Sequence, residues 1–227
     1  MKILGIAAKW LFMLCLPTLL LTASLGWATN SHWLYKYGFE KYDVNQTTGL
    51  AQSELDKVAT ELISYFNSGE EYITLTVVKD GESLELFTPE ETIHFKDVKG
   101  LIWLDYWVLL GTLVYALAYA GVCLFWRRKR YWRRLAWGAV GGSSITLALM
   151  LALGLSTFLG FRQLFTQFHL LFFSNEYWSA EGYMLLLFRE RFFYDAALFC
   201  GSIIVGLAII FGVIGGIYLR RIKGQTS

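Results

Sequence analysis

Two histidines of this chain stand where an imidazole could move protons. His94 follows an acidic helix start, and Asp97 comes three residues later, on the same face of a helix. His169 lies in a segment rich in phenylalanine. Histidine has a pKa of about 6.5, so it can act as a general base or acid near neutral pH. The alternative for each is an interfacial histidine that only forms hydrogen bonds.

Motifs for other kinds of catalysis are missing from the sequence. It has no Gly-x-Ser-x-Gly elbow, no His-Glu-x-x-His zinc motif and no phosphate-binding loop, and no serine or cysteine adjoins His94 or His169. Cys15, Cys123 and Cys200 each fall within an apolar run and lack metal-ligand spacing. We interpret them as small apolar residues, rather than as a disulfide or a zinc site. Neither a metal nor an organic cofactor is expected.

The composition points to lipid as the surrounding solvent. Of the 227 residues, 56% are hydrophobic, and the mean hydropathy of +0.45 is high for a soluble domain. Four apolar stretches are long enough to cross about 30 Å of hydrocarbon as helices. We therefore predict an α-helical membrane protein, a four-transmembrane-helix bundle with a small extracellular α+β domain. The predicted segments are transmembrane helices at 1–29 (uncleaved), 101–126, 135–159 and 195–219, extracellular segments at 30–100 and 160–194, a basic cytoplasmic loop at 127–134 and a cytoplasmic tail at 220–227.

Charge predicts the orientation of these spans. The segment Trp126–Arg134 holds six of the 20 Lys and Arg residues and no acidic residue. The positive-inside rule then places both termini in the cytoplasm. We attribute the basic cluster to topology and contact with anionic lipid, so no nucleic-acid partner is expected. The alternative for the first span is a cleaved signal peptide, since Lys2 and Lys9 precede its apolar stretch.

Local patterns predict the elements of the first extracellular segment. The expected elements are a helix over 52–67 and a hairpin with strands at 72–78 and 83–87 around a turn at 79–82. Thr88-Pro89-Glu90-Glu91 then predicts a helix start, because Thr88 can cap, proline suits the first helical position and Glu91 completes a capping box. This helix carries His94 just above the bilayer.

The second extracellular segment is rich in aromatic residues. Its residues at helical spacing are Phe161, Phe165, Phe168, His169 and Phe172. Such a segment would expose too many aromatic rings in water, so we expect it at the membrane interface or in the mouth of the bundle. That places His169 at the same membrane level as His94.

Two segments resemble signatures of a bacterial membrane protein family. Phe87–Lys99, which contains Glu-x-x-His-x-x-Asp-Val, resembles the first signature, and Phe161–Trp178 followed by Leu187–Phe193 resembles the second. The family includes the lipoprotein intramolecular transacylases of Gram-positive bacteria, and the resemblance extends over the whole chain. The sequence differs from the family pattern at Arg189, where a proline is usual, and at Glu176, where an aspartate is common.

The resemblance implies a reaction within one lipoprotein molecule in the cell membrane. One acyl chain moves from the sn-2 oxygen of the diacylglyceryl group to the α-amino group of the N-terminal cysteine, which gives a lyso-form lipoprotein. The partners would be diacylated lipoproteins and lipid of the outer leaflet. Since both reacting groups belong to one substrate, orientation alone can contribute about 7–11 kcal/mol, and no enzyme nucleophile is needed.

We predict the following roles on this basis. His94 would be the base for the amine, with Asp97 orienting or charging it, and His169 would stabilise the oxyanion or protonate the glycerol oxygen. The two histidine roles could be exchanged. The residues predicted to form the wall of the site are Asn175, Trp178, Glu190 and Arg191.

Two other functions fit the same topology. A noncatalytic sensor or assembly subunit would need no histidine pair. A membrane-embedded hydrolase would need a nucleophile or a metal near His94.

Overall fold

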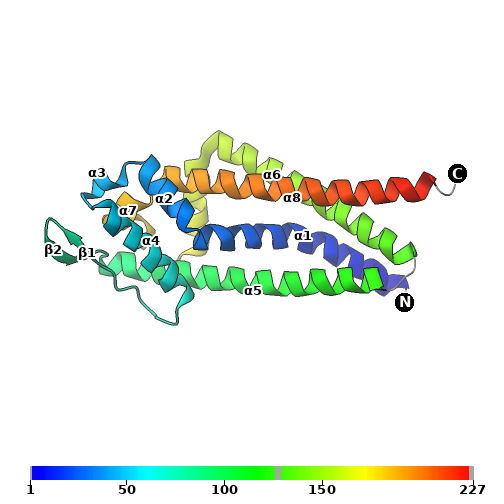
Figure 1. Cartoon of the computed structure of the whole chain (residues 1–227), viewed down its shortest axis with the longest axis horizontal. Coiled ribbons are helices and arrows are strands. Elements are labelled where there is room, and N and C mark those ends of the chain that lie inside the picture. The colour runs from blue at the N-terminus through cyan, green and yellow to red at the C-terminus, as the bar shows by residue number, and fades with distance from the viewer. Residues whose placement is uncertain (1, 126–128, 225–227) are drawn as a thin grey trace. The chain divides into compact units, whose positions relative to one another are not determined.

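The computed structural model describes residues 2–125 and 129–224. Its helices are α1 (Lys2–Asn30), α2 (His32–Lys41), α3 (Val44–Thr48), α4 (Gln52–Asn67), α5 (Pro89–Phe125), α6 (Lys129–Phe172), the 3-10 helix η1 (Tyr177–Ser179), α7 (Tyr183–Leu187) and α8 (Glu190–Gly224) (Figure 1). The strands are β1 (Thr76–Lys79) and β2 (Glu82–Glu85). The chain forms two compact units. The first draws its described residues from 1–25, 105–156 and 199–227, and the second comprises 26–104 and 157–198.

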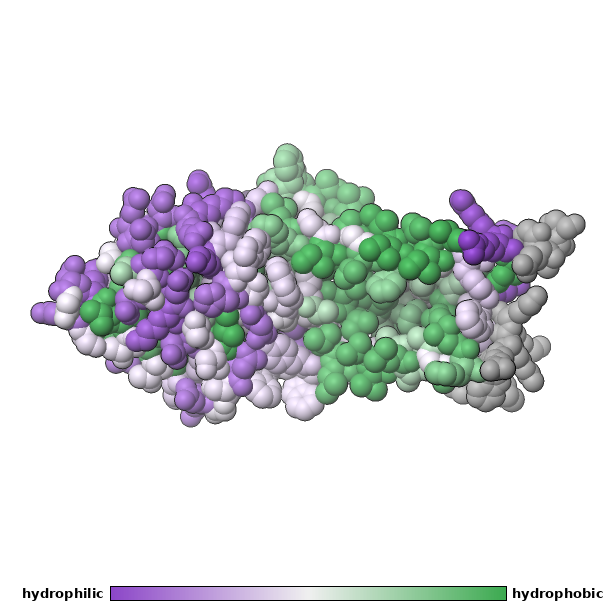
Figure 2. Space-filling model, in the orientation of Figure 1, coloured by the Kyte–Doolittle hydropathy of each residue, from purple (hydrophilic) through white to green (hydrophobic). Residues whose placement is uncertain are grey.

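The first unit consists of apolar parts of four long helices. All four (α1, α5, α6 and α8) are long and apolar enough to cross a membrane. Many of their large side chains, such as Val114 and Leu117, are more than half exposed, and Figure 2 shows apolar residues covering much of this surface. An exposed apolar surface of this extent requires lipid around it. The predicted four-helix membrane architecture is therefore confirmed.

Small residues bring these helices close together. Gly138 and Gly142 of α6 leave room for Phe12 and Leu16 of α1, since an added Cβ would lie 2.8 Å and 2.9 Å from them. Close approach through small residues is typical of helices packed in lipid. A small core forms there from Leu16, Leu20, Ile204 and Ala208.

The helices extend beyond the predicted membrane spans. Of the predicted span 101–126, residues 101–125 form only the later part of α5 and residue 126 lies outside the described residues, while the span 135–159 lies inside α6. Residues 129–134, predicted as part of the cytoplasmic loop 127–134, are helical, and residues 127 and 128 lie outside the described residues. The predicted extracellular loop 160–194 likewise begins as helix, which continues to Phe172 across a kink at Gly160. Hydropathy predicts which residues lie in lipid, but it does not predict where a helix ends. Arg, Lys and Phe can be helical on either side of the lipid boundary.

The second unit has a small core of its own. The predicted helix over 52–67 is confirmed as α4, and its face formed by Leu55, Val58, Ala59 and Leu62 is fully buried. The hairpin is also confirmed, although its strands are shorter than predicted. Asp80 and Gly81 have positive φ angles of 54° and 85°, as a tight two-residue hairpin turn requires.

The start of α5 forms the predicted capping box. The Glu91 backbone N–H donates to Thr88 Oγ1 at 3.3 Å, and the Thr88 N–H donates to Glu91 Oε2 at 2.9 Å. Both groups would otherwise be unpaired at the helix terminus. This cap determines where α5 begins and therefore where His94, in its second turn, lies.

Candidate active site

His94 and His169 lie together in the second unit. The centroids of their rings are 6.0 Å apart, and the two side chains are 6% and 7% exposed. Phe173 contacts both, with ring centroids 4.8 Å from His94 and 5.4 Å from His169. The early turns of α5 and the last turns of α6 therefore bring together the two imidazoles that the sequence predicted to meet.

A backbone carbonyl determines the tautomer of His169. Its Nδ1 lies 2.7 Å from the carbonyl oxygen of Phe165, one turn earlier in α6. A carbonyl only accepts hydrogen bonds, so Nδ1 carries the proton and donates it. Burial lowers the pKa of His169 and so favours the neutral ring. In that form Nε2 has a lone pair and can accept a proton.

His94 is held in its neutral form by its surroundings. It lies in the part of α5 that precedes the predicted membrane span. Burial, with a smaller effect from His169, lowers its pKa from 6.5 to about 4, although the charge of Asp97 acts in the opposite direction. Its Nδ1 is buried and has no hydrogen-bond partner among the described residues. A neutral imidazole always carries one N–H, so His94 can donate a hydrogen bond at neutral pH without being charged.

Asp97 was predicted to orient or charge His94, and its hydrogen bond goes to another residue. No hydrogen bond joins it to His94 in the described part of the chain. Its Oδ2 instead accepts from Nδ2 of Asn175 at 2.9 Å. Asp97 therefore acts on His94 through its charge, while its hydrogen bond holds the loop that follows α6.

Trp178 of η1 packs against His169. Its ring centroid lies 4.8 Å from that of His169. Its indole Nε1 is buried and has no partner among the described residues. Trp178 therefore lies beside His169, and Asn175 is bonded to Asp97; that the two form the wall of the site stays a prediction.

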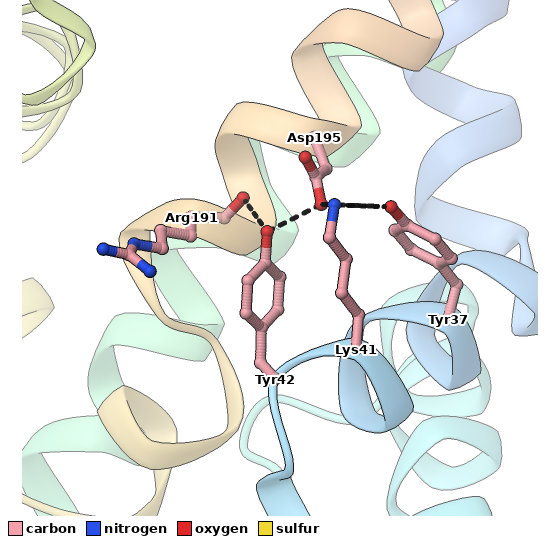
Figure 3. Close-up of polar contacts among 5 residues, drawn as sticks. All are labelled: Tyr37, Lys41, Tyr42, Arg191 and Asp195. Atoms are coloured by element: carbon pink, nitrogen blue, oxygen red, sulfur yellow. Dashed lines mark hydrogen bonds and ion pairs between the residues drawn. The ribbon is translucent and has the colours of Figure 1, made fainter.

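Glu190 and Arg191 lie elsewhere. Glu190 Oε2 is 3.5 Å from Nε of Arg162, in an exposed ion pair. The side chain of Arg191 is exposed and points away from the residues drawn around it in Figure 3. Among the described contacts, neither residue has a hydrogen bond or ion pair with either histidine. Their placement next to paired phenylalanines in the sequence did not determine which side of α8 they would occupy.

The structure gives Glu91, one turn before His94 on α5, a second partner. This carboxylate is 0% exposed, and its Oε1 accepts the backbone N–H of Met184 at 2.6 Å, in addition to the cap bond at Oε2. Gly182 leaves room for it, since an added Cβ would lie 2.3 Å from Oε1. The capping motif could identify the first role of Glu91, but no local signal identified its bond to α7.

A second polar cluster connects α2 to the start of α8. Oδ2 of Asp195 accepts from Tyr42 at 2.6 Å, Lys41 at 2.7 Å and Tyr37 at 3.3 Å (Figure 3). The Tyr42 hydroxyl also lies 3.0 Å from the backbone carbonyl of Arg191. Burial and the bond to Asp195 raise the pKa of Tyr42 to about 12. These residues orient the first turns of α8, and the sequence offered no motif for them.

The histidine pair is distinct from the open cleft of this unit. A cleft of about 520 Å³ lies between α3 and the tip of the hairpin, and it contains none of the predicted site residues. In the described ranges, no three His, Cys, Asp or Glu side chains are grouped so that they could hold a metal ion. The two imidazoles themselves can transfer protons and form hydrogen bonds.

Comparison with solved structures shows what the fold is similar to. Three solved structures of the membrane integral lipoprotein intramolecular transacylase Lit from Bacillus cereus share its fold. The first has a TM-score of 0.81 at 19% identity and covers 100% of both chains. Two others carry a histidine replaced by arginine or alanine and have TM-scores of 0.76 and 0.73, at 18% and 19% identity. They cover 99% and 100% of this chain and 96% and 97% of their own.

Sequence comparison gives the family directly. No curated protein matches the chain. The family model of the lipoprotein intramolecular transacylase Lit matches residues 10–193, which is most of the chain and includes both histidines. This membrane protein therefore belongs to the lipoprotein intramolecular transacylase Lit family.

Proposed function

We propose that this protein moves the sn-2 acyl chain of a lipoprotein's diacylglyceryl group to the α-amino group of the same N-terminal cysteine. Family membership supports an intramolecular transacylation, and the contact between His94 and His169 is the observation that carries the chemistry. The amine nitrogen attacks the ester carbonyl carbon, so a C–N bond forms and the C–O bond to glycerol breaks. The proton leaving the amine ends on the glycerol oxygen, and no further reactant is needed.

The tautomer of His169 supports a role for this residue as the general base. Its Nε2 is the acceptor, and its Nδ1–H is oriented by the Phe165 carbonyl, as a catalytic base is commonly oriented by a third group. It takes the proton from the attacking amine and returns it to the glycerol oxygen. The roles of His94 and His169 are thus exchanged relative to the first assignment made from the sequence, an alternative that the sequence left open.

The low pKa of His94 suits the other role. A group with a pKa of about 4 is a weak base for an amine whose pKa is about 8. It remains neutral at pH 7, however, and a neutral imidazole N–H can polarise a carbonyl. His94 therefore donates a hydrogen bond to the ester carbonyl oxygen as negative charge develops on it.

The charge distribution supports an active site at the outer face of the membrane. Both termini lie in the cytoplasm, because the basic residues between the second and third spans stay on that side. Near the histidines, α6 exposes Leu170 and Leu171 with 58% and 77% of their surface accessible. Lipid of the outer leaflet covers these side chains, so a diacylated lipoprotein reaches the site sideways through the membrane.

The test uses a bacterial strain that makes only diacylated lipoproteins and receives this protein. The expected product is an isomer of the substrate, so total mass does not change. Fragment ions must locate one acyl chain on the cysteine nitrogen, and the α-amino group must become unreactive toward amine reagents. A still-reactive amine with unchanged mass would indicate a noncatalytic role, and loss of an acyl chain would indicate hydrolysis.

Histidine variants connect the activity to the site. His94→Ala and His169→Ala should each lower the rate by about 10²–10⁴-fold. His32→Ala is the matched control, because His32 is exposed and its Nε2 lies 3.3 Å from Thr60 Oγ1, apart from the pair. Full activity in both site variants would refute the assignment of the histidines.

A further inference from the structure

The indole N–H of Trp178 is a buried donor with no acceptor. Among the described residues, five buried side-chain nitrogen or oxygen atoms lack a hydrogen-bond partner, and two of them belong to His94 and Trp178. An indole nitrogen can only donate. Leaving such a donor unpaired costs about 1–3 kcal/mol, so a folded protein rarely retains one without a use. Its position beside His169 indicates that the missing acceptor belongs to a ligand at the histidine pair.

Hydrogen bonds hold Trp178 in place from both sides of the loop that carries it. Before Trp178, Asn175 donates to Asp97 at 2.9 Å, and after it the N–H of Met184 donates to Glu91 at 2.6 Å. Glu91 and Asp97 lie on α5, three residues before and three residues after His94. The helix that positions His94 therefore also positions the loop with Trp178.

The loop also has its own internal bonds. Asn175 Oδ1 accepts the backbone N–H of Tyr177 at 3.1 Å, and the Glu176 carbonyl accepts the N–H of Ser179 at 3.0 Å. The Trp178 ring then packs against His169 at 4.8 Å. A donor held this firmly needs little reorganisation when charge develops near it, which is the requirement for stabilising an oxyanion.

We propose that the Nε1–H of Trp178 donates a hydrogen bond to the acyl carbonyl oxygen and holds it as the oxyanion of the tetrahedral intermediate. This inference rests on the proposed function, in which His169 takes the amine proton and His94 is a first donor to the same oxygen. The indole keeps its proton throughout, so no bond to Trp178 forms or breaks. Two donors on one oxygen resemble the paired N–H groups found in acyl-transfer sites in general.

A conservative variant isolates the N–H from the ring. Trp178→Phe retains an aromatic ring against His169 but removes the donor. We expect kcat for a synthetic diacylglyceryl-cysteine peptide to fall by about 10²–10³-fold, as for loss of one oxyanion donor. KM should change much less, since the bond strengthens only as charge develops. The pH dependence of kcat should keep its shape, because no titrating group has been altered.

Trp103→Phe is the matched control. Its indole N–H donates to the Phe66 carbonyl at 3.2 Å, so the variant loses an N–H that has a structural partner. We expect its kcat to equal that of the wild type. A similar fall in kcat in both variants would mean that loss of any indole N–H disturbs the fold, and it would overturn the specific role of Trp178.

An isosteric replacement provides the decisive comparison. Benzothienylalanine at position 178 retains the size and shape of the indole but has sulfur in place of the N–H, so it separates the hydrogen bond from packing even if Trp178→Phe unfolds. A rate close to that of the wild type would overturn this inference and leave the proposed function intact. A wild-type protein that forms no N-acylated peptide would refute the proposed function and, with it, this inference.

Discussion

His94 should titrate far below the ordinary range of histidine. Its side chain is 6% exposed, and burial together with His169 lowers its pKa to about 4 despite the charge of Asp97. At pH 6.5 about half of the unfolded chains would carry a protonated His94. In the folded protein the fraction would be about one in 300, because the pKa lies about 2.5 units lower.

This difference makes folding stability depend on pH. A decrease in pKa from 6.5 to about 4 corresponds to about 3 kcal/mol between the two protonation states. Since the folded pKa lies below the unfolded one, the unfolded chain binds the proton first as pH falls. The stabilisation is therefore present above pH 6.5 and is lost as pH falls from 6.5 toward 4. His94→Gln should remove this part of the pH dependence.

The measurement is an NMR titration of protein containing isotope-labelled histidine. The chain has 3 histidines, so the His94 signal can be assigned from its absence in His94→Gln. Asp97→Asn should lower the pKa of His94 further, because the aspartate charge favours the protonated ring. His169→Phe should raise it, since that imidazole opposes protonation. A His94 that titrates near pH 6.5 in the folded protein would refute both its assigned burial and its role as a neutral donor.

Three further variants test the packing around the site by thermal unfolding in detergent. Glu91→Ala leaves the buried N–H of Met184 and the part-buried N–H of Thr88 without an acceptor and should cost about 2–6 kcal/mol. Glu91→Gln retains one acceptor oxygen and should cost less. Equal stability of the two variants would contradict these two hydrogen bonds. Asp195→Asn should cost about 1–3 kcal/mol and lower the pKa of Tyr42, which an ultraviolet titration would detect. An unchanged tyrosine titration would show that the hydrogen bond between Tyr42 and Asp195 is not formed. Gly38→Ala would place a Cβ 2.3 Å from the Phe192 ring and should cost about 1–3 kcal/mol, so a fully stable variant would argue against this close approach.

Local signals in the sequence were sufficient for much of the fold. Apolar runs predicted four membrane helices, because a span must satisfy its own backbone in lipid. The capping box at Thr88 and Glu91 correctly predicted where α5 begins, and helical periodicity correctly predicted α4. Each of these features depends on residues within a few positions of one another, so the sequence carries them directly.

The lengths of the helices were harder to predict from the sequence. The predicted loops at 127–134 and 160–194 contain long stretches of helix, since α6 runs from Lys129 to Phe172. Hydropathy decreases where a helix leaves lipid, but the backbone hydrogen bonds continue until packing or a capping residue ends them. The ends of the helices therefore could not be predicted from hydropathy alone.

The sequence also predicted which residue types could carry the chemistry, but only the tertiary structure decided which of them contact one another. The sequence predicted two histidines on separate segments at one membrane level, whereas the 6.0 Å between their rings depends on how α5 and the end of α6 pack. Asp97 bonds Asn175 rather than His94 for the same reason. Which groups meet is determined by side-chain packing between segments distant in sequence, and no local pattern encodes that choice. Residue types thus limit what the site can do, and the packing of the second unit determines which residue does it.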